Sequence, residues 1–330
     1  MDFEEKKNIT IADVAQALGV SKTTVSRAIS GKGRIGEATR ARVLSYIAEH
    51  GYRPNLVAKG LAQSKTYNVC VVMPEHYGMS ELSFFQECLF GIEKAGGAAG
   101  YDVLLSICDN RDISSLVRII ENGKADGVIL MCSFVKDAQV EFLQERGIPF
   151  VMTGSSDYPG VVQIDHDHRS ACRELTAWLL QKGRERIALI GGNETHMVTK
   201  MRMAGFLDAY RAAKREVDPA LFFPGLYQAA SIEAAVRSLP ALHADAVLCM
   251  DDLVASHVLR TLREPDAQGA LMLASFYNGI LLENHVMPVT AISFNARSLG
   301  MTACGTLLDL LGGGSVSERT LLPYEIIYRE

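Results

Sequence analysis

The chain has 330 residues, of which 48% are hydrophobic and 22% charged, a composition typical of a globular protein with room for more than one domain. No apolar run is long enough to cross a membrane, and the N-terminus lacks the apolar core of a secretion signal, so we expect a cytoplasmic protein with no membrane partner. The seven cysteines form no C-x-x-C pair and mostly lie in apolar runs, which predicts reduced core residues.

The net charge of −5 is unevenly distributed along the chain. Residues 6–65 hold eleven Lys or Arg against three Asp or Glu, a balance of +8, which leaves −13 for the remainder. A basic head on an acidic body indicates a nucleic-acid-binding module joined to a second domain. The alternative is that these charges only form a solvated surface. That interpretation explains the acidic charge of the body better than the basic charge of the head.

Residues 9–30 have the pattern of two short helices joined by a tight turn. Thr10 is a good N-cap with Asp13 three residues later, and Gly19 can end the first helix in the left-handed conformation. Apolar residues at helical spacing give each helix a buried face; these are Ile11, Val14, Ala15, Leu18, Val25, Ala28 and Ile29. The outward side chains of the second helix are polar or cationic, which suits the major groove of DNA; a helical hairpin of a small bundle is the alternative.

A third helix is predicted over Glu37–His50, with Thr39, Val43, Ile47 and Ala48 on its buried side. Residues 55–62 follow Pro54 and have the length of one short helix. Gly60 lowers the helix propensity of this segment, and an alanine at position 60 should raise it. Such a helix is unstable alone in water, so we expect it to form with a partner helix on DNA; a plain linker is the alternative. The expected division is a helix-turn-helix domain at 1–53, a hinge at 54–66 and a body at 67–330.

From residue 68 onward, short apolar runs alternate with amphipathic stretches. Strands are predicted at 69–73, 102–107, 127–132, 150–153, 187–190, 246–250 and 271–276, with a final strand near the C-terminus. Helices are predicted at 84–98, 113–122, 138–146, 167–182, 200–214 and 253–262. This alternation predicts an α/β fold with doubly wound parallel sheets and a ligand site beyond the carboxyl ends of the strands.

The body shows no motif of a known enzyme class. Gly191-Gly192 follows a predicted strand, but no G-x-G-x-x-G accompanies it. Asp165-His166-Asp167-His168 alternates two metal-ligand types, yet acidic residues at a strand-to-helix junction normally favour the helix N-terminus. We therefore expect no catalytic residue, no metal and no cofactor.

Two stretches, D-V-A-x-x-x-G-V-S-x-x-T-V-S-R at 13–27 and G-Y-R-P-N-x-x-A-x-x-L at 51–61, resemble the lactose-repressor (LacI/GalR) family of bacterial transcription regulators. The resemblance extends over nearly the whole chain and implies a homodimer on double-stranded operator DNA. It implies that Lys22, Thr23 and Arg27 read bases, and that phosphates are contacted by Ser21, Thr24, Ser26, Tyr52 and Asn55. It also implies that Leu61, flanked by Ala58 and Lys59, wedges into the minor groove from a hinge helix.

For the body, the resemblance implies a two-lobed periplasmic-binding-protein-like (type I) sensor domain with an effector in the cleft. The candidate effector contacts are Glu75, Tyr77, Phe85, Arg202, Tyr227, Asp251 and Tyr277. Arg202 stands in the family's x-R-x-x-G-F pattern, whereas Tyr277 replaces a usual aspartate and Gly154-Ser155-Ser156 replaces another. Fewer carboxylates leave a simple sugar, a larger glycoside, another metabolite or a degenerate pocket open.

The expected function is that of a ligand-responsive repressor of carbohydrate-utilisation genes, with a sugar or glycoside as its small-molecule effector. The alternative is a small-molecule-binding module with vestigial or altered DNA binding.

Overall fold

The computed structural model describes residues 9–31, 33–52, 60, 63–75, 79–226, 228–262, 271–283, 285 and 287–329. The chain divides into two compact units, Met1–Thr66 and Tyr67–Glu330, which we call the head and the body. Within the described ranges, no helix is long and apolar enough to cross a membrane.

The head contains α1 (Ile11–Leu18), α2 (Lys22–Ser30) and α3 (Glu37–His50). Thr10 caps α1 as predicted, because its hydroxyl accepts a hydrogen bond from Asp13 N while the Asp13 carboxylate accepts one from Thr10 N at 2.8 Å. Gly19 ends α1 with a φ of 65°, the left-handed conformation expected of it.

The three helices enclose a small apolar core. Its buried members are Val14, Ala15, Val25, Ala28, Val43 and Tyr52. The predicted inward faces of α1 and α2 are confirmed, but the prediction for α3 is wrong at Ala48, which is exposed, whereas Tyr46 packs against the core. Arg42 donates to Leu18 O at 3.0 Å and Arg40 to Ala28 O at 3.4 Å, so part of the head's positive charge satisfies carbonyls at the C-terminal ends of α1 and α2.

The body contains two six-stranded sheets. The first has the order β11-β5-β4-β3-β1-β2, formed by Arg319–Leu322, Val162–His166, Phe150–Thr153, Gly127–Leu130, Asn68–Met73 and Asp102–Ile107. The second has the order β12-β10-β9-β8-β6-β7, formed by Tyr324–Ile327, Thr290–Phe294, Met272–Ser275, Ala246–Cys249, Ile187–Ile190 and Phe222–Phe223. All pairs are parallel except β12 with β10, as a doubly wound fold requires.

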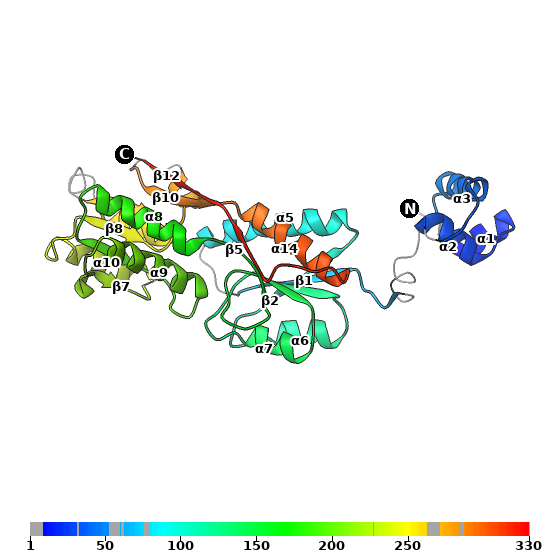
Figure 1. Cartoon of the computed structure of the whole chain (residues 1–330), viewed down its shortest axis with the longest axis horizontal. Coiled ribbons are helices and arrows are strands. Elements are labelled where there is room, and N and C mark those ends of the chain that lie inside the picture. Colours follow the sequence, from blue (N-terminus) through cyan, green and yellow to red (C-terminus); the bar gives the residue numbers. More distant parts are fainter. Residues whose placement is uncertain are drawn as a thin grey trace, which may run out of the picture. The chain divides into compact units, whose positions relative to one another are not determined.

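Each sheet and its helices form one lobe, with separate apolar clusters on the two faces of the sheet. Lobe 1 holds α5 (Met79–Ala98), α6 (Ser114–Glu121), α7 (Ala138–Glu145) and α14 (Ala296–Leu311). Lobe 2 holds α8 (His168–Gln181), α9 (Met197–Ala212), α10 (Ala229–Ser238), α11 (Asp252–Thr261), the short α13 (Ile280–Glu283) and the 3₁₀ turn η1 (Pro219–Leu221). This is the predicted two-lobed α/β architecture (Figure 1).

The chain crosses between the lobes at three described places: from β5 to α8, from β10 to α14, and from β11 to β12. Asp167 and Asn295 lie at the first two crossings, where their side chains cap α8 and α14. Figure 1 shows α14 (orange) beside α5 (cyan), although the two helices are far apart in sequence. The three crossings together connect the lobes, and we call them the interlobe crossings to distinguish them from the predicted hinge at 54–66.

Close packing of α5 with α14 and of α8 with α9 depends on glycines at the crossings, among them Gly91 of α5. A Cβ at Gly300 of α14 would lie 1.9 Å from Cys88 O of α5, and a Cβ at Gly205 of α9 would lie 2.3 Å from Arg169 O of α8. Because real Cβ atoms do not approach a carbonyl oxygen so closely, each helix pair requires glycine at its crossing.

Most body elements agree with the sequence prediction, with shifted ends. The helix predicted at 200–214 begins at Met197, and the one predicted at 84–98 begins at Met79. The prediction omitted β5, β7, β10, α10, α13 and α14, and it gave one strand near the C-terminus where the structure has β11 and β12. Helix α14 has apolar residues and glycines around its circumference, so its sequence shows no clear polar face.

Candidate functional site

The outward face of α2 carries the side chains predicted to meet DNA. Lys22, Thr23, Ser26 and Arg27 are exposed, and Thr24 is half-buried. Ser21 caps α2 by accepting from Thr24 N at 3.1 Å, and the Ser21 and Thr24 hydroxyls lie 2.8 Å apart. These two hydroxyls therefore hold the start of the helix as well as facing outward.

Two of the predicted DNA contacts, Arg27 and Tyr52, also pack against other parts of the head. The Arg27 side chain lies against Gly33, where an added Cβ would be 3.3 Å from its Cδ and Nε. Tyr52 is only 8% exposed and belongs to the head core, and this burial raises the pKa of its phenol. The predicted contacts Asn55, Ala58, Lys59 and Leu61 lie outside the described residues.

A cavity lies between the two lobes of the body, where the strands of both sheets end. Lobe 1 contributes Phe84, Phe85, Met131, Cys132, Ser133, Thr153, Gly154, Asp165 and Leu299. Lobe 2 contributes His168, His196, Val198, Arg202, Asp251, Tyr277 and Phe294. This is the crevice in which α/β proteins of this architecture hold ligands.

The charged side of the cavity is formed by Arg202 and Asp251. Asp251 caps α11 by accepting from Val254 N at 2.8 Å, and burial raises the pKa of its carboxyl while that bond and Arg202 act in the opposite direction. Arg202 donates one hydrogen bond to Met250 O. Its Nε is buried without a hydrogen-bond partner among the described residues. The guanidinium can therefore accommodate a further acceptor on a ligand.

Aromatic rings form much of the remaining wall. Phe84 makes edge contacts with Phe85 at 5.6 Å and with Tyr277 at 5.7 Å between ring centroids. Tyr277 and Phe294 lie nearly parallel, with centroids 6.5 Å apart. Rings in this arrangement offer flat apolar surface to a ligand.

The two lobes are also joined at the cavity by a backbone clasp, which comprises residues 133–135 of lobe 1 and 195–197 of lobe 2. Val135 N donates to Thr195 O at 2.9 Å and Met197 N donates to Ser133 O at 3.0 Å. Next to the clasp, Lys200 of lobe 2 pairs with Asp157 of lobe 1 at 2.5 Å. The lobes are therefore in mutual contact on a side of the cavity where no chain crossing occurs.

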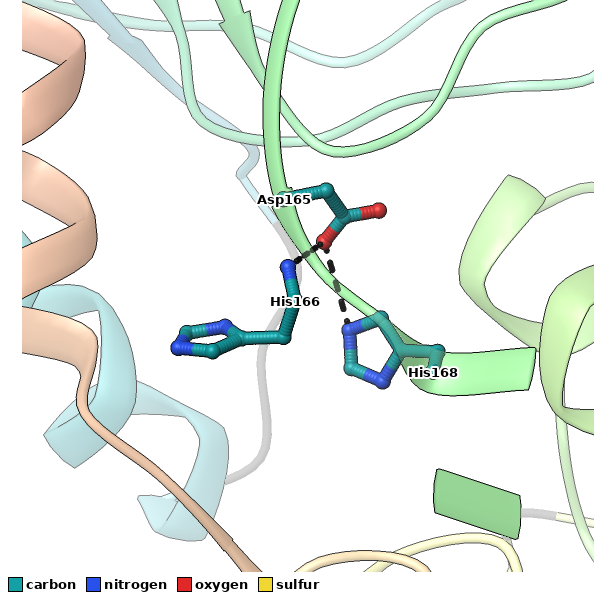
Figure 2. A group of neighbouring side chains, drawn as sticks. All are labelled: Asp165, His166 and His168. Atoms are coloured by element: carbon teal, nitrogen blue, oxygen red, sulfur yellow. Dashed lines mark hydrogen bonds and ion pairs between the residues drawn. The ribbon is translucent and has the colours of Figure 1, made fainter. Parts of the chain in front are cut away.

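At the β5–α8 crossing, Asp165, His166 and His168 form a buried group (Figure 2). Asp165 and His168 line the cavity. Asp165 accepts from Ser155 Oγ and from His166 N, both at 2.8 Å, and His168 Nε2 lies 3.4 Å from its Oδ1. Burial alone would raise the pKa of Asp165, but His168 and the hydrogen bonds hold it below its usual value. Burial and the adjacent His168 lower the pKa of His166 to about 4, so the His166 ring is neutral at pH 7.

Of the predicted effector contacts, Phe85, Arg202, Asp251 and Tyr277 line the same cavity. Glu75 is exposed and is not among the lining residues, whereas Tyr77 and Tyr227 lie outside the described residues. Sequence reasoning did not select Cys132, Ser133, His168, His196 or Phe294 as effector contacts. Cys132 ends a predicted strand and Ser133 follows it directly, so the position of both residues is a usable signal. Phe294 belongs to β10, a strand that was not predicted.

Two family models match the chain. The model described as "Bacterial regulatory proteins, lacI family" matches residues 10–55, and the one described as "Periplasmic binding proteins and sugar binding domain of LacI family" matches residues 66–329. Together they cover the head and the body.

Individual proteins resemble the chain along nearly its full length. The HTH-type transcriptional regulator AglR of Rhizobium meliloti is 31% identical over 97% of this chain and 93% of its own. A solved complex of the transcriptional regulator CelR with cellobiose is 27% identical, with a TM-score of 0.71 over 98% of this chain and 99% of that one.

The lac repressor dimer bound to operator and the anti-inducer ONPF has the same fold, with a TM-score of 0.78 at 23% identity over 98% of both chains. The family models and the relatives agree with the helix-turn-helix head and the two-lobed body. The chain therefore belongs to the LacI family of bacterial regulatory proteins, and it is a ligand-responsive, DNA-binding transcription regulator.

Proposed function

We propose that the protein represses carbohydrate-utilisation genes as a homodimer whose affinity for its operator depends on a sugar or glycoside held between the lobes. The observation that carries this proposal is the cavity, which combines aromatic walls with the Arg202 guanidinium and the Asp251 carboxyl. Sugars present both hydroxyls and flat C–H faces, and this mixed lining suits both.

The carboxylates of the cavity favour a glycoside over a free monosaccharide. Asp251 already caps α11, and Asp165 already accepts two hydrogen bonds from its own lobe. The resemblance to the family implies that Tyr277 and the stretch Gly154-Ser155-Ser156 replace two further carboxylates, and Tyr277 and Gly154 line the cavity. On this proposal the polar contacts available to hydroxyls are fewer and the apolar surface is larger. A sugar joined to a second sugar or to an apolar group matches that balance. We propose that this ligand is released without any chemical change and that the protein is not an enzyme.

For DNA, we propose that Lys22, Thr23 and Arg27 contact base edges. Phosphate contacts are proposed for Ser21, Thr24, Ser26, Tyr52 and Asn55, and a minor-groove role for Ala58, Lys59 and Leu61. The proposed division is a DNA-binding domain at 1–53, a hinge at 54–66 and an effector-binding and dimerisation domain at 67–330. A protein that binds the operator must share its compartment, so we propose a cytoplasmic location.

The surface of lobe 1 supports a homodimer. Phe90 on α5 and Leu105 and Ile107 on the edge strand β2 are 45%, 46% and 53% exposed. Large apolar side chains at an unpaired sheet edge normally meet another protein surface. Sedimentation of the wild type and of a Leu105→Glu, Ile107→Glu double variant tests this: the wild type should be a dimer and the variant a monomer.

The function is tested with the purified full-length chain and the DNA upstream of its own gene. A panel of sugars and glycosides is screened by thermal shift, because a bound ligand raises the unfolding temperature by mass action. Each hit is then added to a gel-shift titration with that DNA and is recovered afterwards for mass analysis. Sequence-specific binding that changes with a recovered, unaltered glycoside supports the proposal. Ligand binding without specific DNA binding would instead indicate a binding module with a vestigial head.

A further inference from the structure

Asp165, His166 and His168 bring three potential metal ligands, one carboxylate and two imidazoles, to one buried place. One ligand atom from each residue lies within 4.8 Å of the other two, and all three side chains are buried. Figure 2 shows Asp165 and His166 at the end of β5 and His168 at the start of α8. The Asp165 carboxylate accepts from the backbone N of His166 and contacts the ring of His168.

The histidines have unused ring nitrogens. Among the described residues, neither Nδ1 nor Nε2 of His166 has a hydrogen-bond partner, and Nδ1 of His168 also has none. His166 is 1% exposed and packs against Phe294 at 4.8 Å between ring centroids. Buried polar atoms normally have partners, because an unpaired one costs about 1–3 kcal/mol. A bound group that accepts the lone pair of an imidazole nitrogen would satisfy these atoms.

The position of these residues is not explained by helix capping. The sequence led us to expect acidic residues there for the N-terminus of α8, and Asp167 does perform that role by accepting from Ser170 N at 3.0 Å. Asp165 points elsewhere, toward Ser155 and His168. The capping argument accounts for Asp167 alone and does not explain why Asp165, His166 and His168 are buried together.

The distances suit a small divalent cation. Two ligands held at about 2.0–2.1 Å from a tetrahedral zinc ion are roughly 3.3 Å apart, and Asp165 Oδ1 and His168 Nε2 are separated by 3.4 Å. A ring nitrogen of His166 lies within 4.8 Å of a ligand atom of Asp165 and of His168, so the His166 side chain must rotate to join them. Two imidazoles and one carboxylate are a donor set that favours a borderline transition metal over Ca²⁺ or Mg²⁺.

We propose that Asp165, His166 and His168 bind a divalent transition-metal ion of the zinc type at the crossing between the lobes. Two ligands come from β5 of lobe 1 and the third from α8 of lobe 2, so the ion would tie the strand of one lobe to the helix of the other. Asp165 and His168 also line the cavity, so a three-ligand ion there leaves a coordination position for water or for a ligand hydroxyl.

The test uses the untagged full-length chain after dialysis against a chelator. Zn²⁺ is titrated calorimetrically into the wild type, into His166→Asn and His168→Asn, and into His196→Asn as a control, because His196 lines the same cavity outside the group. We expect one Zn²⁺ per chain in the wild type and the control, and affinity lower by on the order of 100-fold or more in the other two variants. Circular dichroism establishes that each variant is folded, and if His168→Asn is not, His166→Asn decides.

Co²⁺ as a probe identifies the donor atoms. We expect ligand-field absorption without thiolate charge-transfer bands, because Cys132 lines the cavity but lies outside the proposed ligand group. The proposal is overturned if the wild type binds no Zn²⁺, if both histidine variants bind it as the wild type does, or if thiolate bands show cysteine ligands.

Discussion

Gly205 connects the packing of lobe 2 to the cavity between the lobes. In Gly205→Ala the new Cβ would lie 2.3 Å from Arg169 O and 3.0 Å from Arg173 N of α8, so α9 must move away from α8. Arg202 is one turn earlier on α9 and lines the cavity, so the movement should displace its guanidinium. We expect a less stable body and a weaker response to ligand from this one methyl group.

The control is Gly305→Ala on α14, where no atom lies within 4 Å of the new Cβ. Both changes replace a glycine inside a helix, so the gain in helix propensity of about 1 kcal/mol is common to them and cancels. The remaining difference is the overpacking cost, about 1–3 kcal/mol. For a domain of this size, each kcal/mol corresponds to a shift in Tm of roughly 2–4 °C.

The measurement is thermal unfolding of the full chain, followed by calorimetry and by the fluorescence of its single tryptophan, Trp178, which lies on α8. Gly305→Ala should unfold at or above the wild-type temperature, and Gly205→Ala below it. The reasoning fails if the two variants have the same Tm, because the close approach of α8 and α9 would then be relieved without cost.

Three further predictions concern the DNA and ligand sites. Arg27→Ala should weaken specific operator binding by about 1–3 kcal/mol but spare random DNA in gel shifts; equal losses would make Arg27 a phosphate contact. Arg202→Ala should bind operator normally but not respond to ligand; a wild-type dose response would remove Arg202 from the site. Gly60→Ala should weaken operator binding, because its Cβ would lie 2.4 Å from Lys65 O and disturb the bond that Lys65 N donates to Gly60 O. Tighter binding would show that alanine's helix propensity prevails.

For Gly60→Ala, the structure predicts weaker operator binding, whereas the sequence alone predicts a more stable hinge helix. Sequence reasoning included only the local propensity of alanine, whereas the structure adds a backbone bond that encloses Gly60. Where structure depends on neighbouring residues alone, sequence was sufficient: the Thr10–Asp13 cap, the Gly19 end of α1 and the buried face of α2 are all as predicted. Helix α14 was not predicted, because the need for glycine at Gly300 comes from the close packing of α14 against α5.

The cavity could be predicted in part for the same reason. Asp251 directly follows a predicted strand, in agreement with the rule that ligands bind at the carboxyl ends of parallel strands. Arg202 lies on a helix and was selected from its resemblance to the family's x-R-x-x-G-F pattern. The clasp and the unpartnered His166 depend on how the two lobes meet, and no local pattern in the sequence encodes that contact. Glu75 also follows a strand but is not among the lining residues, which shows the limit of the rule.

The three crossings explain how a ligand can act on DNA. At each described crossing a single residue separates the elements of the two lobes, so a change in the angle between the lobes bends the chain at Asp167, Asn295 and Pro323. The clasp opposes an opening of the lobes with two backbone hydrogen bonds. A ligand that contacts Arg202 of lobe 2 and Phe85 of lobe 1 would favour one angle over others by its difference in binding free energy. Lobe 1 begins at β1, which follows the proposed hinge directly, so we propose that the lobe angle changes the free energy with which two hinges fold on the operator.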